Sequence, residues 1–150
     1  MQADGKVVIL ESESFFGHFD RFPVTPGHLE VIPKRHIASL FDLTRKEEIE
    51  IIAALRRGVE VTRSTDLRVL YRGYIENPLN ESSVRFCKDA LRDLELNRQR
   101  EGENIGINNG TAAGRTVDHL HIHIIPRYVG DVPDPAGGIR HIIPGKGNYK

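Results

Sequence analysis

Residues 118–125 read Asp-His-Leu-His-Ile-His-Ile-Ile, an alternation of polar and apolar side chains that limits how this segment can fold. A period of two is typical of a β-strand with one buried face and one open face. On such a strand His119, His121 and His123 share a face, with neighbouring members about 6.6–6.8 Å apart, while the apolar residues between them face the core. The alternation therefore predicts three imidazoles on one wall of a site, held by a rigid element.

Three histidines within five positions are a poor fit to chance, because the chain has seven histidines in 150 residues. One alternative is a metal site, since a His-x-His strand can place two nitrogens on one ion. Another is nucleophilic catalysis by imidazole at a phosphorus or acyl centre. The preceding segment favours catalysis: Gly110 and Gly114 can present backbone N–H groups to an anion, and side-chain donors follow at Asn108, Arg115 and Thr116.

The composition indicates an ordinary globular chain. Hydrophobic residues make up 39% and charged residues 28%, which does not fit collagen-like, disordered or membrane classes. Lys and Arg number 21, as do Asp and Glu, so the formal net charge is zero and gives no general attraction to nucleic acid or to a membrane. The length of 150 residues fits one compact domain, which we expect to span 1–150.

The cysteine content and the apolar runs bear on location. Cys87 is the only cysteine, so the chain cannot form an intramolecular disulfide or a cysteine-based zinc site. No apolar run approaches the ~20 residues of a spanning helix, and residues 1–6 lack the basic-then-apolar order of a signal peptide. We therefore expect a cytoplasmic protein without membrane or nucleic-acid partners.

Two helices are predicted. Residues 44–47, Thr-Arg-Lys-Glu, have the form of a capping box, and a helix with one apolar face should run from there to about residue 63. A second helix is predicted over 82–97, with Cys87 on its apolar stripe as a packing residue rather than a reactive thiol. The apolar face of the first helix comprises Ile49, Ile52, Ala53, Leu55 and Val59.

Short β-branched and aromatic runs, bounded by Pro, Gly and polar residues, predict the strands. A polar connector covers 97–103, and the residues around His141 alternate as in a late strand. Strands at the two ends of the chain, with helices inserted between them, favour an α+β domain with a mostly antiparallel sheet. The predicted strands cover residues 7–10, 14–20, 28–32, 104–108 and 117–125.

Three blocks of the chain resemble the histidine triad family. Residues 119–125 are similar to its signature His-φ-His-φ-His-φ-φ, in which φ is apolar. Residues 22–36, which include Pro-Gly-His and Ile-Pro-Lys-Arg-His, resemble the family's first block. Residues 104–117 resemble the block that leads into the triad. The resemblance covers about 7–60 and 103–145 in the expected order, and it leaves an insertion at about 70–102 unmatched.

The resemblance implies a five-stranded, mostly antiparallel sheet with two main helices, and a homodimer that joins two sheets into one of ten strands. It also implies attack on the α-phosphorus of a nucleoside phosphate derivative through a nucleotidyl-histidine intermediate, with release of a nucleoside monophosphate. No cofactor is required in that route, although a divalent cation can accompany a polyphosphate substrate. The implied partner is a small nucleotide.

Matching positions imply roles for single residues. His121, the middle histidine, would be the nucleophile. His119 and His123 would flank it, contacting phosphate oxygens or orienting the ring. His28 in Pro-Gly-His would fix the tautomer of the nucleophile, and Asp20 would accept hydrogen bonds from the ribose hydroxyls.

The resemblance also implies phosphate contacts from Asn108, Thr116 and backbone amides near Gly114 and Arg115. Two of the site positions depart from the family pattern. Arg115 stands where glutamine is usual, so its charge would either meet a polyphosphate chain or point to solvent. His18 replaces an apolar residue at the edge of the base pocket and weakens any inference about the base.

The Pro-Gly-His block at 26–28 and residues 123–128, His-Ile-Ile-Pro-Arg-Tyr, look closer to the dinucleoside polyphosphate hydrolases, the branch that includes the fragile histidine triad proteins, than to the phosphoramidate hydrolases. Adenosine-containing polyphosphates are then the expected substrates. Purine nucleoside phosphoramidate hydrolysis and dinucleoside polyphosphate phosphorolysis remain alternatives. From another class, a non-catalytic nucleotide- or metal-binding module remains open. His36 is expected to be structural, and His141 to lie at the surface or an interface.

Overall fold

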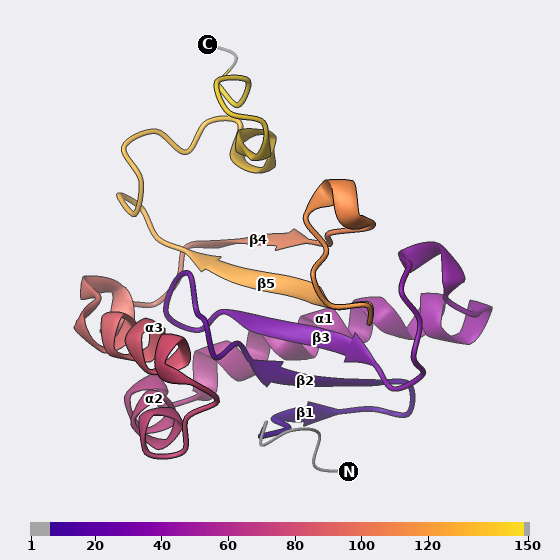
Figure 1. The fold of residues 1–150 in the computed structure, drawn as a ribbon, viewed down its shortest axis with the longest axis horizontal. Helices are drawn as coiled ribbons and strands as arrows, with labels where there is room; N and C mark the ends of the chain where they lie inside the picture. The colour runs from indigo at the N-terminus through magenta and orange to yellow at the C-terminus, as the bar shows by residue number, and fades with distance from the viewer. Residues whose placement is uncertain (1–6, 149–150) are drawn as a thin grey trace.

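A computed structural model describes residues 7–148 (Figure 1). Five strands form one sheet in the order β1-β2-β3-β5-β4, and each neighbouring pair is antiparallel. This confirms the α+β class and the five-stranded antiparallel sheet. The strands are β1 Leu10–Glu11, β2 Phe15–Phe19, β3 Leu29–Pro33, β4 Gly102–Gly106 and β5 Ile122–Arg127.

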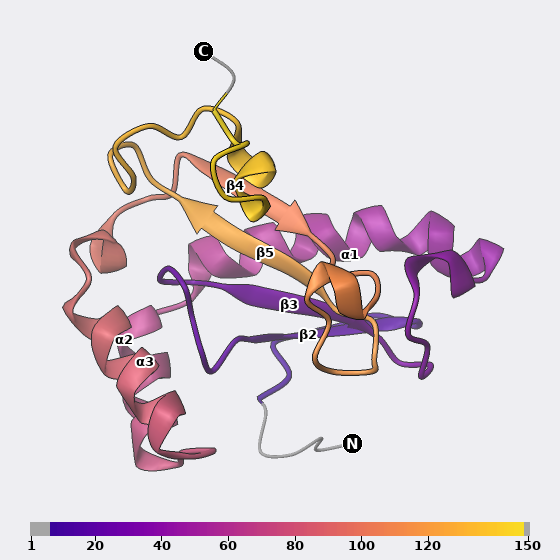
Figure 2. The ribbon, with the colours of Figure 1, turned by 45° about the horizontal axis from the view of Figure 1, so that its top comes forward.

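Helix α1 (Arg45–Ser64) covers one face of the sheet, as Figures 1 and 2 show from two sides. A glycine permits the close approach: a Cβ atom added at Gly58 would lie 2.8 Å from Ile124 Cδ1 and 3.1 Å from Leu29 Cδ2. Leu29, Val31 and Ile124 are completely buried on that side. Since side chains alternate along a strand, the residues between them face away from α1.

The start of α1 follows the predicted capping box. The Thr44 hydroxyl accepts from the Glu47 backbone N–H, and the Glu47 carboxylate accepts from the Thr44 N–H at 2.7 Å. The apolar face of the helix is partly wrong in the prediction, because Ile49 and Ile52 are exposed. The buried positions instead include Ala54, Gly58 and Val61, whose small volumes suit close packing on the sheet.

Residues 67–97 contain one helix more than predicted. Helix α2 (Leu67–Glu76) was not predicted. Helix α3 (Glu81–Arg92) is followed by a short 3-10 helix, η2 (Leu94–Asn97), so the predicted helix 82–97 is two elements. Helices α2 and α3 lie side by side at one end of the sheet (Figures 1 and 2). The Tyr71 hydroxyl of α2 accepts from the Gly27 N–H at 2.7 Å.

Strand boundaries differ from the predictions at both ends of the chain. Of residues 7–10, only Leu10 belongs to β1. The ladder of β5 begins at Ile122, so His119 and His121 lie before the strand and only His123 lies within it. The late strand around His141 is wrong, since residues Gly138–Ile142 form a 3-10 helix, η4. Gly137, with φ 90°, introduces that turn in the left-handed region that favours glycine.

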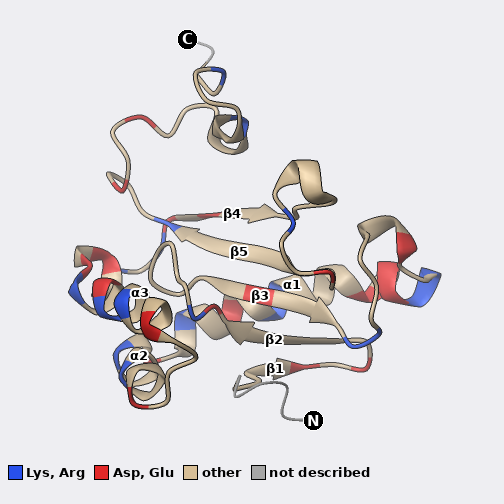
Figure 3. Cartoon of the chain, viewed as in Figure 1, with Lys and Arg blue, Asp and Glu red and all other residues tan. Residues whose placement is uncertain are grey.

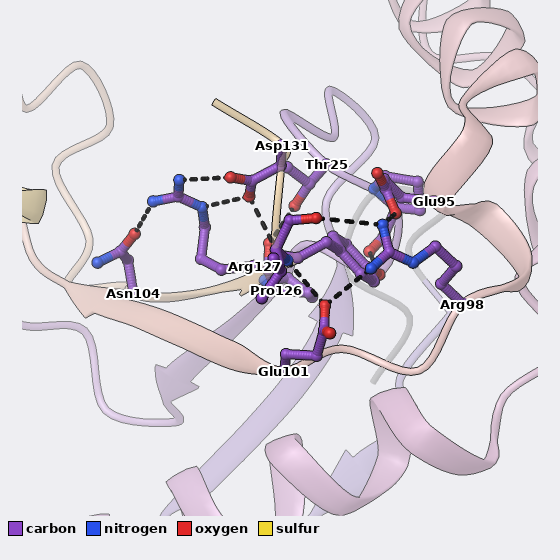
Figure 4. Close-up of polar contacts among 11 residues, drawn as sticks. Thr25, Glu95, Arg98, Glu101, Asn104, Pro126, Arg127 and Asp131 are labelled. Carbon is purple, nitrogen blue, oxygen red and sulfur yellow. Dashed lines mark hydrogen bonds and ion pairs between the residues drawn. The ribbon is translucent and has the colours of Figure 1, made fainter. Parts of the chain in front are cut away.

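The far end of β5 is anchored by ion pairs and hydrogen bonds (Figure 4). Arg127 contacts both carboxylate oxygens of Asp131, at 2.6 and 2.8 Å, and donates to Asn104 Oδ1 on β4 at 2.6 Å. Glu101 accepts from the Val129 N–H at 2.7 Å. These contacts fix the direction in which the chain leaves the sheet.

Charged residues concentrate on the helices and connecting segments (Figure 3). Both signs are interspersed on α1 and on the α2–α3 pair, in agreement with the zero net charge. Strand β3, in contrast, carries a single acidic residue, Glu30, among apolar neighbours. No helix within residues 7–148 has the length and apolarity needed to cross a bilayer. The N-terminal residues 1–6, which were examined for a signal peptide, lie outside the described part.

Candidate active site

The sheet register brings three polar residues of three strands into one row. His18 of β2 lies opposite Glu30 of β3, and Glu30 lies opposite His123 of β5. All three occupy the face of the sheet opposite α1, because their neighbours Leu29, Val31 and Ile124 pack toward that helix. The row forms the floor of the candidate site.

A cavity of about 530 Å³ opens over this row. Its lining combines polar residues with aromatic and aliphatic side chains, which suits a ligand with a charged group and an apolar ring. Its lining consists of Phe16, His18, Asp20, Arg21, Phe22, Glu30, Ile32, Leu79, Asn108, Thr116, Val117, His119, His121 and His123.

The backbone before β5 orients the middle histidine. His121 Nδ1 lies 2.8 Å from the carbonyl oxygen of His119. A carbonyl only accepts, so the proton sits on Nδ1 and the Nε2 of a neutral His121 keeps its lone pair. His119 is itself anchored, since its Nε2 donates to the Pro33 carbonyl at 2.9 Å.

His28 and Asp20 hold the third histidine. His28 Nε2 lies 3.0 Å from His123 Nδ1, and Asp20 Oδ2 lies 3.2 Å from His28 Nδ1 in an electrostatic contact without good hydrogen-bond geometry. The carboxylate favours the proton on His28 Nδ1, so His28 Nε2 accepts and His123 Nδ1 donates. The Nε2 of His123 is then also left with a lone pair.

Burial keeps these imidazoles neutral. Desolvation lowers the pKa of His28 to about 4, with added repulsion from His123 and His121, while Asp20 opposes the shift. Burial also lowers the pKa of His123, helped by His121 and opposed by Asp20. Neutral imidazoles at pH 7 can act as nucleophiles and hydrogen-bonding groups without first losing a proton.

Most of the predicted site residues meet in this cavity. The three triad histidines line it together with His18, Asp20, Asn108 and Thr116. His28 lies just beneath the lining and is 3% exposed, so it reaches the cavity through His123. His18 is 1% exposed and donates from Nδ1 to the Phe19 carbonyl at 3.2 Å, which places it at the floor rather than the rim.

The backbone amides of the glycine turn, predicted to contact phosphate, donate to carbonyl groups within the turn. The Gly114 N–H donates to the Thr111 carbonyl at 3.0 Å, and the Arg115 N–H donates to the Gly110 carbonyl at 3.2 Å, so both amides are used within the turn. The Arg115 guanidinium donates to the Ala38 carbonyl at 2.9 Å and pairs with Asp118 at 3.0 Å. Arg115 is not among the residues that line the cavity.

The partner of His121 also differs from the prediction. His28 was expected to fix the tautomer of the nucleophile, but it contacts His123 instead. The main-chain carbonyl of His119 takes that place beside His121. The reason is the strand register, which puts the start of β3 next to β5 at His123.

Sequence reasoning missed Glu30 and the residues that the insertion contributes. The only local signal for Glu30 was a charge in the middle of an apolar strand. Leu79, between α2 and α3, lines the cavity, and Phe22 packs edge-on against Phe86 of α3 at 5.7 Å between ring centres. The insertion therefore shapes one wall of the cavity.

His36 and Cys87, which were predicted to be structural, do not line the cavity. His36 is exposed and lies outside the cavity lining, with its ring 4.9 Å from that of His119. Cys87 is 1% exposed within the core, and burial raises the pKa of its thiol to about 11. A thiol with so high a pKa is inert at neutral pH.

Two sets of side chains in residues 7–148 have ligand atoms within 4.8 Å of one another, close enough to surround a metal ion. One set is Asp20, His28 and His123, whose facing nitrogen atoms already contact each other. The other is Glu30, His121 and His123.

This geometry agrees with the outcome of comparison with known proteins. Residues 2–130 match the model of the HIT domain, the histidine triad domain. The match covers most of the chain, so the protein belongs to the HIT family.

Its relatives include enzymes of dinucleoside polyphosphates. An AP-4-A phosphorylase of Mycobacterium tuberculosis is 28% identical over 126 residues, which are 83% of this chain and 48% of that protein. An asymmetrical bis(5'-nucleosyl)-tetraphosphatase of Schizosaccharomyces pombe is 32% identical over 109 residues, 73% of this chain and 42% of that protein. The tetraphosphatase confirms the resemblance to the dinucleoside polyphosphate branch. The chain spans about half the length of these relatives.

Solved structures support the fold. A HIT family protein from Bacillus subtilis is 27% identical, with a TM-score of 0.55 over 82% of this chain and 64% of that one.

Proposed function

We propose that this chain is a nucleotide hydrolase that acts at the α-phosphorus of dinucleoside polyphosphates, with adenosine forms among its substrates. One observation carries the proposal: His121 lines the cavity with its Nδ1 bonded to the His119 carbonyl at 2.8 Å, so that Nε2 is the nitrogen available to attack a phosphorus atom. The names of the relatives supply the substrate class, since they include a tetraphosphatase and a phosphorylase of such nucleotides.

In the proposed reaction His121 Nε2 attacks the α-phosphorus, and a nitrogen–phosphorus bond forms while the bond to the bridging oxygen breaks. The departing polyphosphate keeps the electron pair of that bond. Water then attacks phosphorus and releases the monophosphate, returning the pair to Nε2. His123, fixed by His28, and His119, fixed by Pro33, flank the reacting group, and no metal of the protein's own takes part.

The aromatic part of the cavity suits the nucleoside. Phe16 and Phe22 can pack on a base, and Asp20 at the end of β2 can accept from ribose hydroxyls. Asn108 and Thr116, which are exposed and also line the cavity, can donate to phosphate oxygens.

The test is a His121→Asn variant assayed with a dinucleoside tetraphosphate. We expect turnover to fall by at least about 10³-fold while nucleotide binding persists. Wild-type protein quenched during turnover of a phosphorus-labelled substrate should carry label on histidine in an acid-labile bond. Unchanged turnover in the variant contradicts the mechanism.

Reaction products distinguish hydrolysis from phosphorolysis. With inorganic phosphate present, a hydrolase releases a nucleoside monophosphate, whereas a phosphorylase transfers the nucleotidyl group to phosphate and releases a diphosphate. A parallel assay with nucleoside phosphoramidates compares kcat/KM values and so decides between the branches.

We also propose that the chain forms a homodimer through β4. This strand lies at an edge of the sheet and has a neighbour, β5, on one side only. A second copy could add its own β4 to that edge. Light scattering coupled to size-exclusion chromatography tests the assembly, and charged substitutions at the exposed Ile105 should shift it toward monomer.

A further inference from the structure

A second cavity, of about 510 Å³, lies where the C-terminal part of α1 meets η2 and the end of β5. It shares no lining residue with the cavity of the triad histidines, and the proposed reaction assigns it no task. Its charged lining residues are Arg63, Arg98 and Arg100, and none of its lining residues is acidic. We call it the arginine cavity, because its lining is positively charged although the whole chain has a net charge of zero.

The three arginines differ in how far their charge is already compensated. Arg98 Nη1 lies 2.6 Å from a carboxylate oxygen of Glu95, and Arg98 Nη2 lies 2.9 Å from one of Glu101 (Figure 4). Arg63 is exposed and has no ion-pair partner within residues 7–148. The charges available to a ligand are therefore those of Arg63 and Arg100.

Arg100 carries a buried charge whose hydrogen bonds go to neutral groups. Its side chain is 4% exposed and donates to the Val59 carbonyl at 2.6 Å and to the Thr62 hydroxyl at 2.9 Å. Glu103 Oε2 lies 3.9 Å from Arg100 Nε, which is too far for a hydrogen bond, and Nε has no hydrogen-bond partner within residues 7–148. A buried charge without a close counter-ion is costly, so this guanidinium favours a bound anion.

The neighbouring arginine adds to that cost. Burial lowers the pKa of Arg100 and repulsion from Arg63 lowers it further, while Glu103 opposes the shift. An anion that contacts both guanidinium groups would replace this repulsion with two attractions. Phosphate oxygens suit the purpose, because they accept paired hydrogen bonds from the planar guanidinium group.

We propose that the arginine cavity binds a phosphate-bearing anion through Arg63 and Arg100. Asn97 and Gln99, which also line the cavity, supply further donors for its oxygens. The volume lies within the range of small-molecule sites, so it admits a phosphate chain or a phosphate ester as well as free phosphate. The site is independent of the proposed function.

The experiment titrates tripolyphosphate, which has no base or ribose, into the protein in a calorimeter. We expect a binding step that Arg63→Gln and Arg100→Gln each weaken by at least about tenfold, and that Arg63→Lys weakens less, since it keeps the charge. Arg45→Gln is the matched control with wild-type affinity. It changes an exposed arginine of the same helix, 18 residues before Arg63 and thus about 27 Å away along the axis.

Arg63→Gln keeps the test valid if Arg100→Gln does not fold, because Arg100 also ties its segment to α1 through Val59 and Thr62. Asn108→Ala, which changes the cavity of the triad histidines, should leave the step unchanged. Separate titrations with orthophosphate and AMP distinguish free phosphate from the phosphate group of a nucleotide as the preferred ligand.

Three outcomes overturn the anion site. The first is the absence of saturable tripolyphosphate binding by the wild type. The second is wild-type affinity in folded Arg63→Gln. The third is a loss of affinity in Asn108→Ala but not in Arg63→Gln, which would assign the anion to the cavity of the triad histidines.

Discussion

His28 Nε2 lies 3.0 Å from His123 Nδ1, although 95 positions separate the two residues in the chain. The antiparallel pairing of β3 with β5 creates this contact, since Leu29 lies opposite Ile124. The Asp20 carboxylate favours a proton on His28 Nδ1, so His28 Nε2 accepts from His123 Nδ1 and sets the tautomer of the His123 ring. The site is therefore two short hydrogen-bonded units, one ending at His121 and the other at His123.

Asp20 and His28 should affect catalysis through the same residue, His123. We expect His28→Asn to lower kcat/KM by about 10–100-fold, since the Nδ1 proton of His123 loses its acceptor. Asp20→Asn in the His28→Asn background should cost less than in the wild type, because the carboxylate would no longer act through His28. Steady-state kinetics of the double-mutant cycle measure this, and additive losses would contradict a shared pathway.

Arg115 gives a contrasting prediction. Its guanidinium binds the Ala38 carbonyl and Asp118, so Arg115→Gln should leave KM within about threefold for substrates of every phosphate chain length, a difference below about 0.7 kcal/mol. The variant should instead loosen the loop before the triad. Kinetics with tri-, tetra- and pentaphosphates test this, and a KM that rises with chain length would place the charge on the substrate.

Two helix glycines provide a matched pair for packing. Gly58→Ala should destabilise the fold by about 1–3 kcal/mol, because the new Cβ meets Ile124 and Leu29. Gly73→Ala on α2 meets nothing within 4 Å and should be neutral or stabilising by up to about 1 kcal/mol. Urea denaturation measures both free energies of unfolding. Equal effects of the two substitutions would show that helix propensity, not contact with the sheet, decides.

Acid should weaken the start of α1 through Glu47. The bonds from Arg35 chiefly, and from Thr44, lower the pKa of Glu47 to about 2 from an ordinary 4.5. A lowered folded-state pKa gives stability that is present above pH 4.5 and is lost as the pH falls toward 2. Glu47→Gln should cost about 1–2 kcal/mol at pH 7. Denaturation at several pH values should show the gap between the two proteins narrowing below pH 4.5 and closing as the pH approaches 2, and a constant gap would contradict the ionic origin.

The alternation of residues 118–125 correctly predicted which side chains are buried, but not where the strand begins. Burial does alternate from His119 to Tyr128, with Leu120, Ile122 and Ile124 buried between half-buried histidines. The β-ladder nevertheless begins only at Ile122, since the Leu120 N–H donates to the Ile37 carbonyl outside the sheet. Local pattern thus predicted which side chains face the cavity, while long-range pairing decided where the strand begins.

Helix α2 and the role of Glu30 were missed because both depend on contacts between segments that are far apart in the sequence. Helix α2 was not predicted, since its local sequence contains Gly73 and lacks a clear apolar repeat, but Tyr71 and Tyr74 are buried and their packing favours the helix. No pattern within one strand could predict that Glu30 lies between His18 and His123, because that row exists only once three strands are in register. Sequence therefore predicted the chemistry of the residues better than their partners.

The clamp at the far end of β5 has a consequence for the chemistry. Shifting β5 by one residue against its neighbours would turn His123 into the core and Ile124 into the cavity. Arg127 bonds to Asn104 on β4 and to Asp131 beyond the strand, and these contacts favour the observed alignment of β5 with β4. Arg127, which lies outside the cavity, thereby helps to keep His123 on the face of the sheet that lines the cavity.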